Sequence, residues 1–160
     1  VFVATESNLQ DDKKKISAIE VYFLALFLAQ EQIFESISEQ LEPVDFENEE
    51  ARRFWRIVRD IIIHSKPKQI GKLLEKVPKE FGNFIDHLYL VNINPEFMER
   101  EAWAGEITKV VSRIKKASLG RMLFRLSALL KEAQKEHNER RIKQLSEKSD
   151  KLSQILKEIK

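Results

Sequence analysis

The sequence predicts an all-α protein with an N-terminal helical bundle, a long connecting helix and a C-terminal antiparallel helical hairpin. Apolar residues recur three and four positions apart along most of the 160 residues, whereas strand-like alternation is hard to find. Only four glycines and four prolines interrupt the chain. The most apolar segment, VYFLALFLAQ at residues 21–30, is too short for a membrane span, which needs roughly 20 residues. We therefore expect a helix buried on all sides, and no membrane partner.

The first two helices contain this apolar segment and the residues that follow it. We expect the first helix over about residues 16–29 and the second over about residues 31–41. The second helix should stop before Pro43, because the residue preceding a proline is pushed out of helical geometry. Residues 43–48, PVDFEN, then form a turn.

The next three helices complete the predicted bundle. Asn48 is a suitable N-cap for the third helix, and two glutamates follow it at the positive end of the helix dipole. The apolar stripe of this helix consists of Ala51, Phe54, Trp55, Val58, Ile61 and Ile62. Pro67 and Pro78 are placed as first-turn prolines and should each open a shorter helix, the second ending near residues 92–94.

A long helix should begin at Pro95, and its apolar face changes direction partway along. One line of apolar residues comprises Trp103, Ile107, Val110, Ile114 and Ala117, and the next comprises Leu119, Leu123, Leu126, Leu130 and Ala133. The five residues from Ile114 to Leu119, at about 100° each, rotate the apolar face away from its first line, so the two parts of the helix should pack on different partners. We therefore predict a hinge or kink between Lys116 and Gly120, with Lys116, Ala117 and Gly120 as its residues.

The final helix pairs with the second part of the long helix in this prediction. A polar break at residues 136–140, EHNER, precedes a stripe with three- and four-residue spacing that consists of Ile142, Leu145, Ser149, Leu152, Leu156 and Ile159. We expect a linker at 1–15, a bundle at 16–116 and a hairpin at 117–160. The polar opening without methionine indicates a domain excised from a longer protein.

Charge is distributed unevenly between the two parts. Residues 1–110 hold 14 Lys and Arg against 20 Asp and Glu, whereas residues 111–160 hold 14 against 6. A basic hairpin favours a partner with negative potential, either an acidic protein surface or nucleic acid. The alternative is a hairpin whose charges only keep it in solution. We expect nucleic-acid binding to be weak at most, because the hairpin has a single aromatic residue, Phe124, for base stacking.

Partner-binding residues should lie off the hairpin seam. The candidates are Phe124, Arg140, Lys143, Lys151 and Ile155. Exposed aromatic and basic residues are frequent anchors at protein interfaces. The alternatives are that Phe124 folds back onto the bundle and that Ile155 belongs to a wide seam.

The sequence offers little for catalysis. It has no cysteine, which excludes disulfides and thiolate zinc sites and is compatible with the cytoplasm. Its three histidines lack the spacing of metal ligands, and no phosphate-binding glycine-rich loop is present. We therefore expect no enzyme activity, no cofactor and no metal.

Two segments resemble the C-terminal helicase-binding domain of bacterial (DnaG-type) DNA primases. The run LALFLAQEQIFESISEQLEPVDFENEEARRFWRIVRDI has that domain's buried leucine-rich helix, P-x-D-F turn and R-R-x-F/W helix in the same order. The matching positions are Leu24 to Leu28, Pro43, Asp45, Phe46, Arg52, Arg53 and Phe54. The tail from Ser112 to Lys160 resembles the closing hairpin of the domain. One departure is the hairpin turn, where the family often has Gly with Asp and this chain has His137 and Asn138.

The resemblance implies a function in DNA replication. A domain of this family docks the primase on the N-terminal domain of the replicative hexameric (DnaB-type) helicase in the primosome, mainly through the hairpin, and couples primer synthesis to unwinding. The zinc-binding and polymerising parts of the nucleotidyltransferase would lie upstream, and the fragment would be monomeric. Two alternatives remain. A helicase N-terminal collar domain shares the P-x-D-F pattern and should self-associate, whereas a basic helical nucleic-acid-binding domain should lose affinity steeply with salt.

Overall fold

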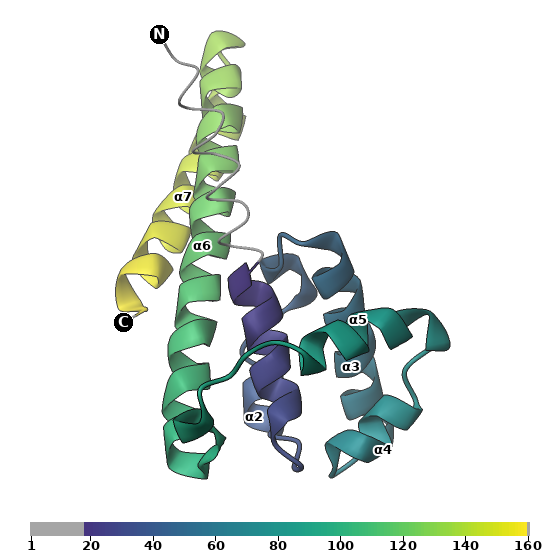
Figure 1. The fold of residues 1–160 in the computed structure, drawn as a ribbon. Coiled ribbons are helices and arrows are strands. Elements are labelled where there is room, and N and C mark those ends of the chain that lie inside the picture. Colours follow the sequence, from purple (N-terminus) through teal and green to yellow (C-terminus); the bar gives the residue numbers. More distant parts are fainter. Residues whose placement is uncertain (1–17, 160) are drawn as a thin grey trace, which may run out of the picture. The chain divides into compact units, whose positions relative to one another are not determined.

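A computed structural model describes residues 18–159, and these residues form helices joined by short turns (Figure 1). The predicted all-α class is confirmed, since the described residues contain no strand beyond one isolated bridge between Gln32 and Gln69. The predicted linker at residues 1–15 and the predicted start of the first helix at Ile16 lie outside the described residues.

The chain divides into two compact units between Ile114 and Lys115. We call residues 18–114 the N-terminal unit and residues 115–159 the C-terminal unit. Helix α6, Arg100–Lys135, contributes residues to both units. The predicted domain boundary, between residues 116 and 117, stays a prediction.

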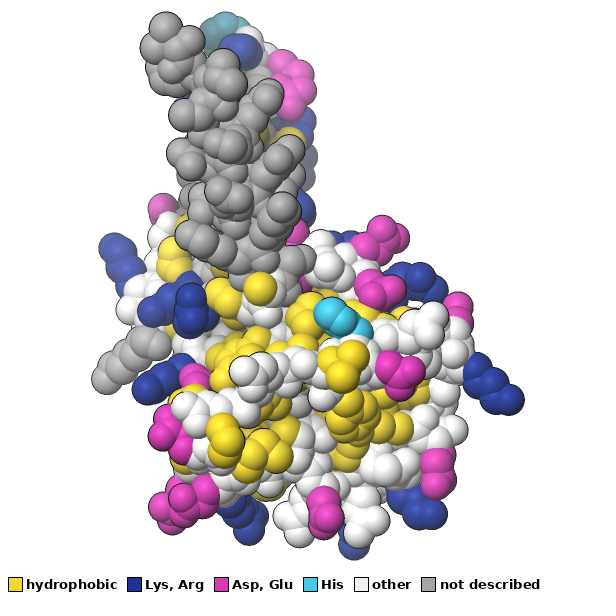
Figure 2. All heavy atoms as spheres, viewed as in Figure 1, with side chains coloured by type: hydrophobic (Ala, Val, Ile, Leu, Met, Phe, Trp, Pro, Cys, Tyr) yellow, Lys and Arg dark blue, Asp and Glu magenta, His cyan; other side chains and the backbone are white. Residues whose placement is uncertain are grey.

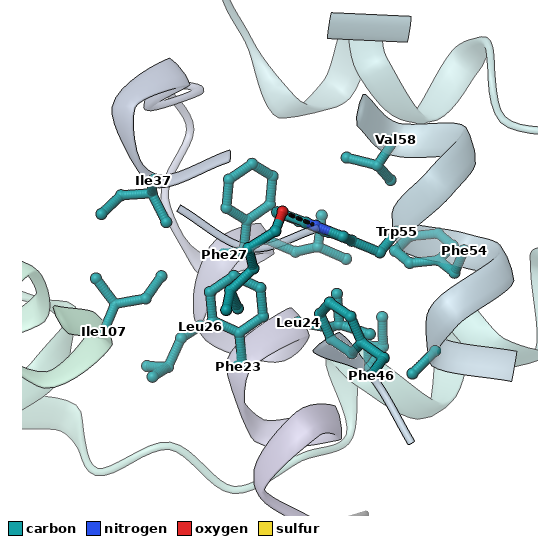
Figure 3. Close-up of a cluster of buried hydrophobic side chains, with 14 of the residues drawn as sticks. Phe23, Leu24, Leu26, Phe27, Ile37, Phe46, Phe54, Trp55, Val58 and Ile107 are labelled. Atoms are coloured by element: carbon teal, nitrogen blue, oxygen red, sulfur yellow. Dashed lines mark hydrogen bonds between the residues drawn. The ribbon is translucent and has the colours of Figure 1, made fainter. Parts of the chain in front are cut away.

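The N-terminal unit begins with a helix over residues 18–29. It continues with α2 (Glu35–Ser38), the 3₁₀ turn η1 (Pro43–Asp45), α3 (Glu49–Ser65), α4 (Ile70–Glu75), η2 (Lys79–Phe81), α5 (Gly82–Tyr89), η3 (Pro95–Met98) and the start of α6. The six consecutive residues from Phe23 to Leu28 are buried, so the first helix is enclosed on all sides, as its composition predicts. Trp55 meets Phe23 and Phe27 edge-on, with ring centroids 5.1 and 5.2 Å apart (Figure 3).

The predicted second helix, at residues 31–41, is wrong in its extent. Only Glu35–Ser38 is helical. The Ile33 amide donates to the Lys68 carbonyl at 3.0 Å, and the Ile70 amide donates to the Glu31 carbonyl at 2.8 Å. These bonds hold the chain in an extended conformation at Gln32, because its neighbours bond to another segment and not to helical partners four residues away.

The predicted N-cap of α3 is confirmed, but three proline positions need correction. The Asn48 side chain accepts from the Ala51 amide at 2.9 Å. Pro67 lies three residues before α4, because the bridge at Gln69 sets where that helix can begin. Pro78 precedes the 3₁₀ turn η2. Pro95 opens η3, and α6 begins only at Arg100.

Side chains from two helices fix the turn between α2 and α3. The Asn48 amide donates to Oε1 of the buried Glu20 at 3.0 Å. Arg52 Nε donates to the Phe46 carbonyl at 3.0 Å, and Trp55 Nε1 donates to the Leu41 carbonyl at 2.8 Å. The turn therefore keeps its backbone satisfied beside an apolar core.

The C-terminal unit comprises the end of α6 and helix α7, Glu139–Glu158. In Figure 1 the chain turns after α6 and α7 runs back beside it. The residues of the two predicted stripes are all buried or half-buried, namely Leu119, Leu123, Leu126, Leu130, Ala133, Ile142, Leu145, Ser149, Leu152, Leu156 and Ile159. These apolar stripes are therefore at least partly shielded from solvent, as the prediction expects of them.

The turn between α6 and α7 uses His137 where a glycine is usual. His137 has φ 57°, its amide donates to the Gln134 carbonyl at 3.2 Å, and the next amide donates to the Ala133 carbonyl at 3.1 Å. This pattern is a Schellman motif, whose left-handed residue is most often glycine because a side chain is disfavoured there. Asn138 then caps α7 by accepting from the Arg141 amide at 3.2 Å.

We expect His137→Gly and Asn138→Ala to change the stability of this turn in opposite directions. The glycine relieves a strained φ and should stabilise α7 by about 0.5–1 kcal/mol, whereas loss of the N-cap should cost about 0.5–2 kcal/mol. Amide hydrogen exchange in α7 measures both effects. Lys66→Gly is the control, since Lys66 has φ 45° in the other unit and should leave exchange in α7 unchanged. Slower exchange in Asn138→Ala would contradict the capping role.

Candidate functional site

The described residues contain no candidate metal site. Within residues 18–159 no group of three or more His, Cys, Asp or Glu side chains is placed to hold a metal ion. His64 lies on the surface of α3, with Nδ1 2.8 Å from the Asp60 carbonyl oxygen of the preceding turn. In the same part of the chain, no helix combines the length and the apolarity that a membrane span requires. The surfaces available for contact with a partner are therefore the features to consider.

The structure leaves the predicted partner-binding residues accessible. The Phe124 side chain is 78% exposed on α6, and Ile155 is 44% exposed on α7. Arg140, Lys143 and Lys151 are exposed on α7. Of the other apolar flanks, Met122 is half-buried and Leu129 is 37% exposed. Phe124 is thus the largest apolar side chain that the C-terminal unit presents to solvent.

The predicted partner-binding residues lie on two helices, with Phe124 on α6 and the other four on α7. Arg140, Lys143, Lys151 and Ile155 lie within about 120° of one another on the outer face of α7. Glu147 and Glu158 lie on this same face, so its charge is mixed. The outer face of α7 therefore carries only a weak positive potential.

A second basic segment, on α6, is missing from the sequence prediction. Between Glu106 and Glu132 the chain contains seven Lys and Arg and no Asp or Glu. Arg125 and Lys131 lie in this segment near Phe124 and are exposed. The absence of acidic residues over this stretch is a signal in the sequence that could have identified it.

The predicted hinge residues lie inside one continuous helix. Lys116, Ala117 and Gly120 are all within α6, whose helical hydrogen bonding continues from Arg100 to Lys135. Lys116 and Gly120 are exposed and Ala117 is half-buried. One continuous helix is compatible with the predicted hinge or kink, which stays a prediction that NMR relaxation of α6 would test.

The N-terminal unit has its own exposed apolar side chains and an open groove. Figure 2 shows hydrophobic patches on this unit between charged side chains. The exposed residues include Leu90, 83% exposed, and Tyr89, 57% exposed. A groove of about 400 Å³ is lined by the end of the first helix, the start of α4 and Tyr89. Partial burial raises the pKa of the Tyr89 hydroxyl above its ordinary value.

A second tyrosine joins the first helix to α6 within the same unit. The Tyr22 hydroxyl donates to Oε2 of Glu106 at 3.3 Å. Burial first, and then the neighbouring Glu106 carboxylate, raise the pKa of Tyr22. This hydrogen bond links the first helix to α6.

The residues that carry the resemblance have structural roles in the N-terminal unit. Asp45 Oδ2 accepts from the Glu42 amide at 2.8 Å. Phe46 and Phe54 are in the core, and Arg52 holds the turn that follows η1. The motif residues therefore specify a fold and do not by themselves constitute a binding site. No protein-family model, curated protein or solved structure matches this chain.

Proposed function

We propose that this chain is a non-catalytic docking domain of the bacterial primase type, which binds the N-terminal domain of the replicative hexameric helicase and couples primer synthesis to unwinding. In this proposal the chain consists of a helical bundle, a long connecting helix and a C-terminal antiparallel hairpin. The hairpin makes the main contact with the helicase. The fragment itself is monomeric and acts in the cytoplasm. The proposal is supported by motifs that resemble those of the primase domain and that occur in the same order along nearly the whole chain.

The exposure of Phe124 is the observation that carries the proposal. The C-terminal unit has few apolar residues to bury, and α7 contains no fully buried residue. A phenylalanine left 78% exposed forgoes most of the roughly 1.5–3 kcal/mol that full burial provides. Exposed aromatic side chains among basic residues are typical anchors of protein interfaces. A partner that covers Phe124 would recover this free energy.

The test is a calorimetric titration of this chain into the hexameric helicase from the same source. We expect the whole chain to bind and a version ending at Lys116 not to bind. The truncation removes all but the first two residues of the C-terminal unit. It keeps the core cluster, whose buried residues lie between Phe23 and Ile114, so the shortened chain should remain folded. Circular dichroism and thermal melting check that it does. If neither chain binds at low salt and high concentration, the proposal is wrong.

Charge reversal locates the contact within the C-terminal unit. Lys143→Glu with Lys151→Glu should weaken helicase binding without changing thermal stability, since both side chains are exposed. Lys79→Glu with Lys109→Glu is the matched control, because it makes the same charge change on exposed residues of the N-terminal unit. Equal weakening by the two pairs would indicate only general electrostatic attraction.

The basic segment of α6 favours a second candidate, nucleic-acid binding. Such binding would weaken steeply as salt is raised, because phosphate contacts release counterions. Titration of a labelled oligonucleotide at two salt concentrations distinguishes it. The helicase-collar alternative predicts a ring-shaped oligomer, which sedimentation analysis of the chain alone would detect.

A further inference from the structure

Phe124 projects from a strip of small residues on α6. Ala117, Gly120 and Ala128 lie seven and four positions before it and four positions after it, on the same side of the helix. Gly120, Phe124 and Ala128 are exposed and Ala117 is half-buried. We call these four residues the Phe124 face. It spans about 16 Å, or three helical turns.

Nothing within the described chain requires Gly120 to be glycine. No glycine in the described part of the chain has a positive φ, and a Cβ added at Gly120 would meet no atom within 4 Å. Glycine is unfavourable inside a helix because it loses the most conformational freedom on folding. Gly105 in the same helix has the same open space, so what distinguishes Gly120 is its place one turn before the exposed Phe124. A residue without a side chain at that place would let the backbone of a partner approach closely.

The charges around the Phe124 face select the partner. Lys116 and Arg125 flank the strip and Lys131 follows it one turn after Ala128, and all three are exposed. Between Glu106 and Glu132 the helix itself contains no Asp or Glu beside these three basic residues. A partner with carboxylates around an apolar stripe is complementary to this arrangement.

We propose that the Phe124 face binds an acidic amphipathic helix. The apolar stripe of that helix packs over Gly120 and Ala128 and receives the Phe124 ring, and its Asp and Glu side chains pair with Arg125 and Lys131. Two copies of this chain pairing symmetrically through the face would bring like charges together, which disfavours self-association there. The inference rests on the proposed function only in that the helix would belong to the helicase.

The first arm of the test uses a defined probe. A fluorescent helical peptide of about five turns, with leucines at i, i+3, i+4 and i+7 flanked by Glu, is titrated with the whole 160-residue chain and followed by anisotropy. A second peptide has Gln in place of every Glu. We expect the Glu peptide to bind at least about tenfold more tightly than the Gln peptide, as desolvated charge pairs require.

Two substitutions test the face itself. Phe124→Ala should weaken binding of the Glu peptide by about 10- to 100-fold, as for an interface hot spot. Gly120→Leu should weaken it by at least about tenfold, because the side chain blocks close approach. Gly105→Leu is the matched control: Gly105 is exposed in the same helix and also has open space where a Cβ would lie, so this variant should bind as the parent does. Circular dichroism confirms that all variants are folded.

The outcomes separate this inference from the proposed function. Binding of the Glu peptide unaffected by Phe124→Ala, or equal binding of the two peptides, would overturn the inference. Phe124-dependent binding of an oligonucleotide in preference to the Glu peptide, or Phe124-dependent dimers in sedimentation, would assign the face to nucleic acid or to a second copy and would also overturn it. If the peptide results are as expected but the helicase does not bind, the proposed function fails and the inference stands. If the helicase binds Phe124→Ala as tightly as the parent, the function stands and the inference fails.

Discussion

Replacing Leu26 by aspartate should unfold the N-terminal unit. Leu26 is fully buried within the run from Phe23 to Leu28. Loss of a buried leucine side chain alone costs about 2–5 kcal/mol, and the aspartate adds the cost of removing a carboxylate from water without a partner. The total is comparable with the whole stability of a domain, about 5–15 kcal/mol. Thermal melting followed by circular dichroism measures the effect.

Leu90→Asp is the matched control for this substitution. Leu90 is in the same unit but is 83% exposed, so the same chemical change should alter the free energy of unfolding by no more than about 0.5 kcal/mol. If the two variants melted at the same temperature, Leu26 would not be part of the core. If Leu90→Asp were the less stable of the two, the result would contradict the burial of Leu26 and the exposure of Leu90.

Trp103→Ala is expected to have the second-largest effect on stability. Trp103 is 1% exposed, and its Nε1 donates to the Leu26 carbonyl at 2.7 Å, joining α6 to the first helix across 77 positions of sequence. The ring also contacts Phe34, with centroids 4.8 Å apart. Removing it opens a large cavity, which costs about 3–5 kcal/mol, and leaves a buried carbonyl without its donor. Urea denaturation measures the loss.

Trp103→Phe separates packing from hydrogen bonding at this position. Phenylalanine keeps most of the apolar contact but cannot donate to Leu26, so we expect a loss of about 1–3 kcal/mol. A Trp103→Phe variant as unstable as Trp103→Ala would mean that the hydrogen bond to Leu26 contributes more than the apolar contacts of the ring. A Trp103→Ala variant as stable as the parent would contradict the central place of this residue in the core.

The helices predicted with most success are those whose apolar residues repeat over several turns. Helix α3 begins at its predicted N-cap, and the predicted stripe residues Phe54, Trp55 and Val58 are buried. In α6 the stripe residues Trp103 and Ile107 are likewise in the core. Periodicity is a local property, because one helix places residues three and four apart on the same face whatever surrounds it.

The candidate site is also partly readable from sequence. The exposure of Phe124 follows from its position off the seam of α6, and the exposure of Lys143 and Lys151 follows from theirs on α7. The basic segment without carboxylates between Glu106 and Glu132 is equally visible in the sequence, although the prediction placed more weight on α7. The sequence does not show that a side chain at position 120 would have open space around it. Only the three-dimensional structure shows this.

The sequence by itself determined the all-α class, the long amphipathic helices and the contrast between an acidic and a basic part. Only the tertiary structure decided where the short helices begin and end. Residues 31–33 are not helical because they bond to residues 68–70, and α4 begins only at Ile70 for the same reason. The physical difference is range: a stripe reports the geometry of one helix, whereas a bridge between Gln32 and Gln69 depends on a chain reversal that no local pattern encodes.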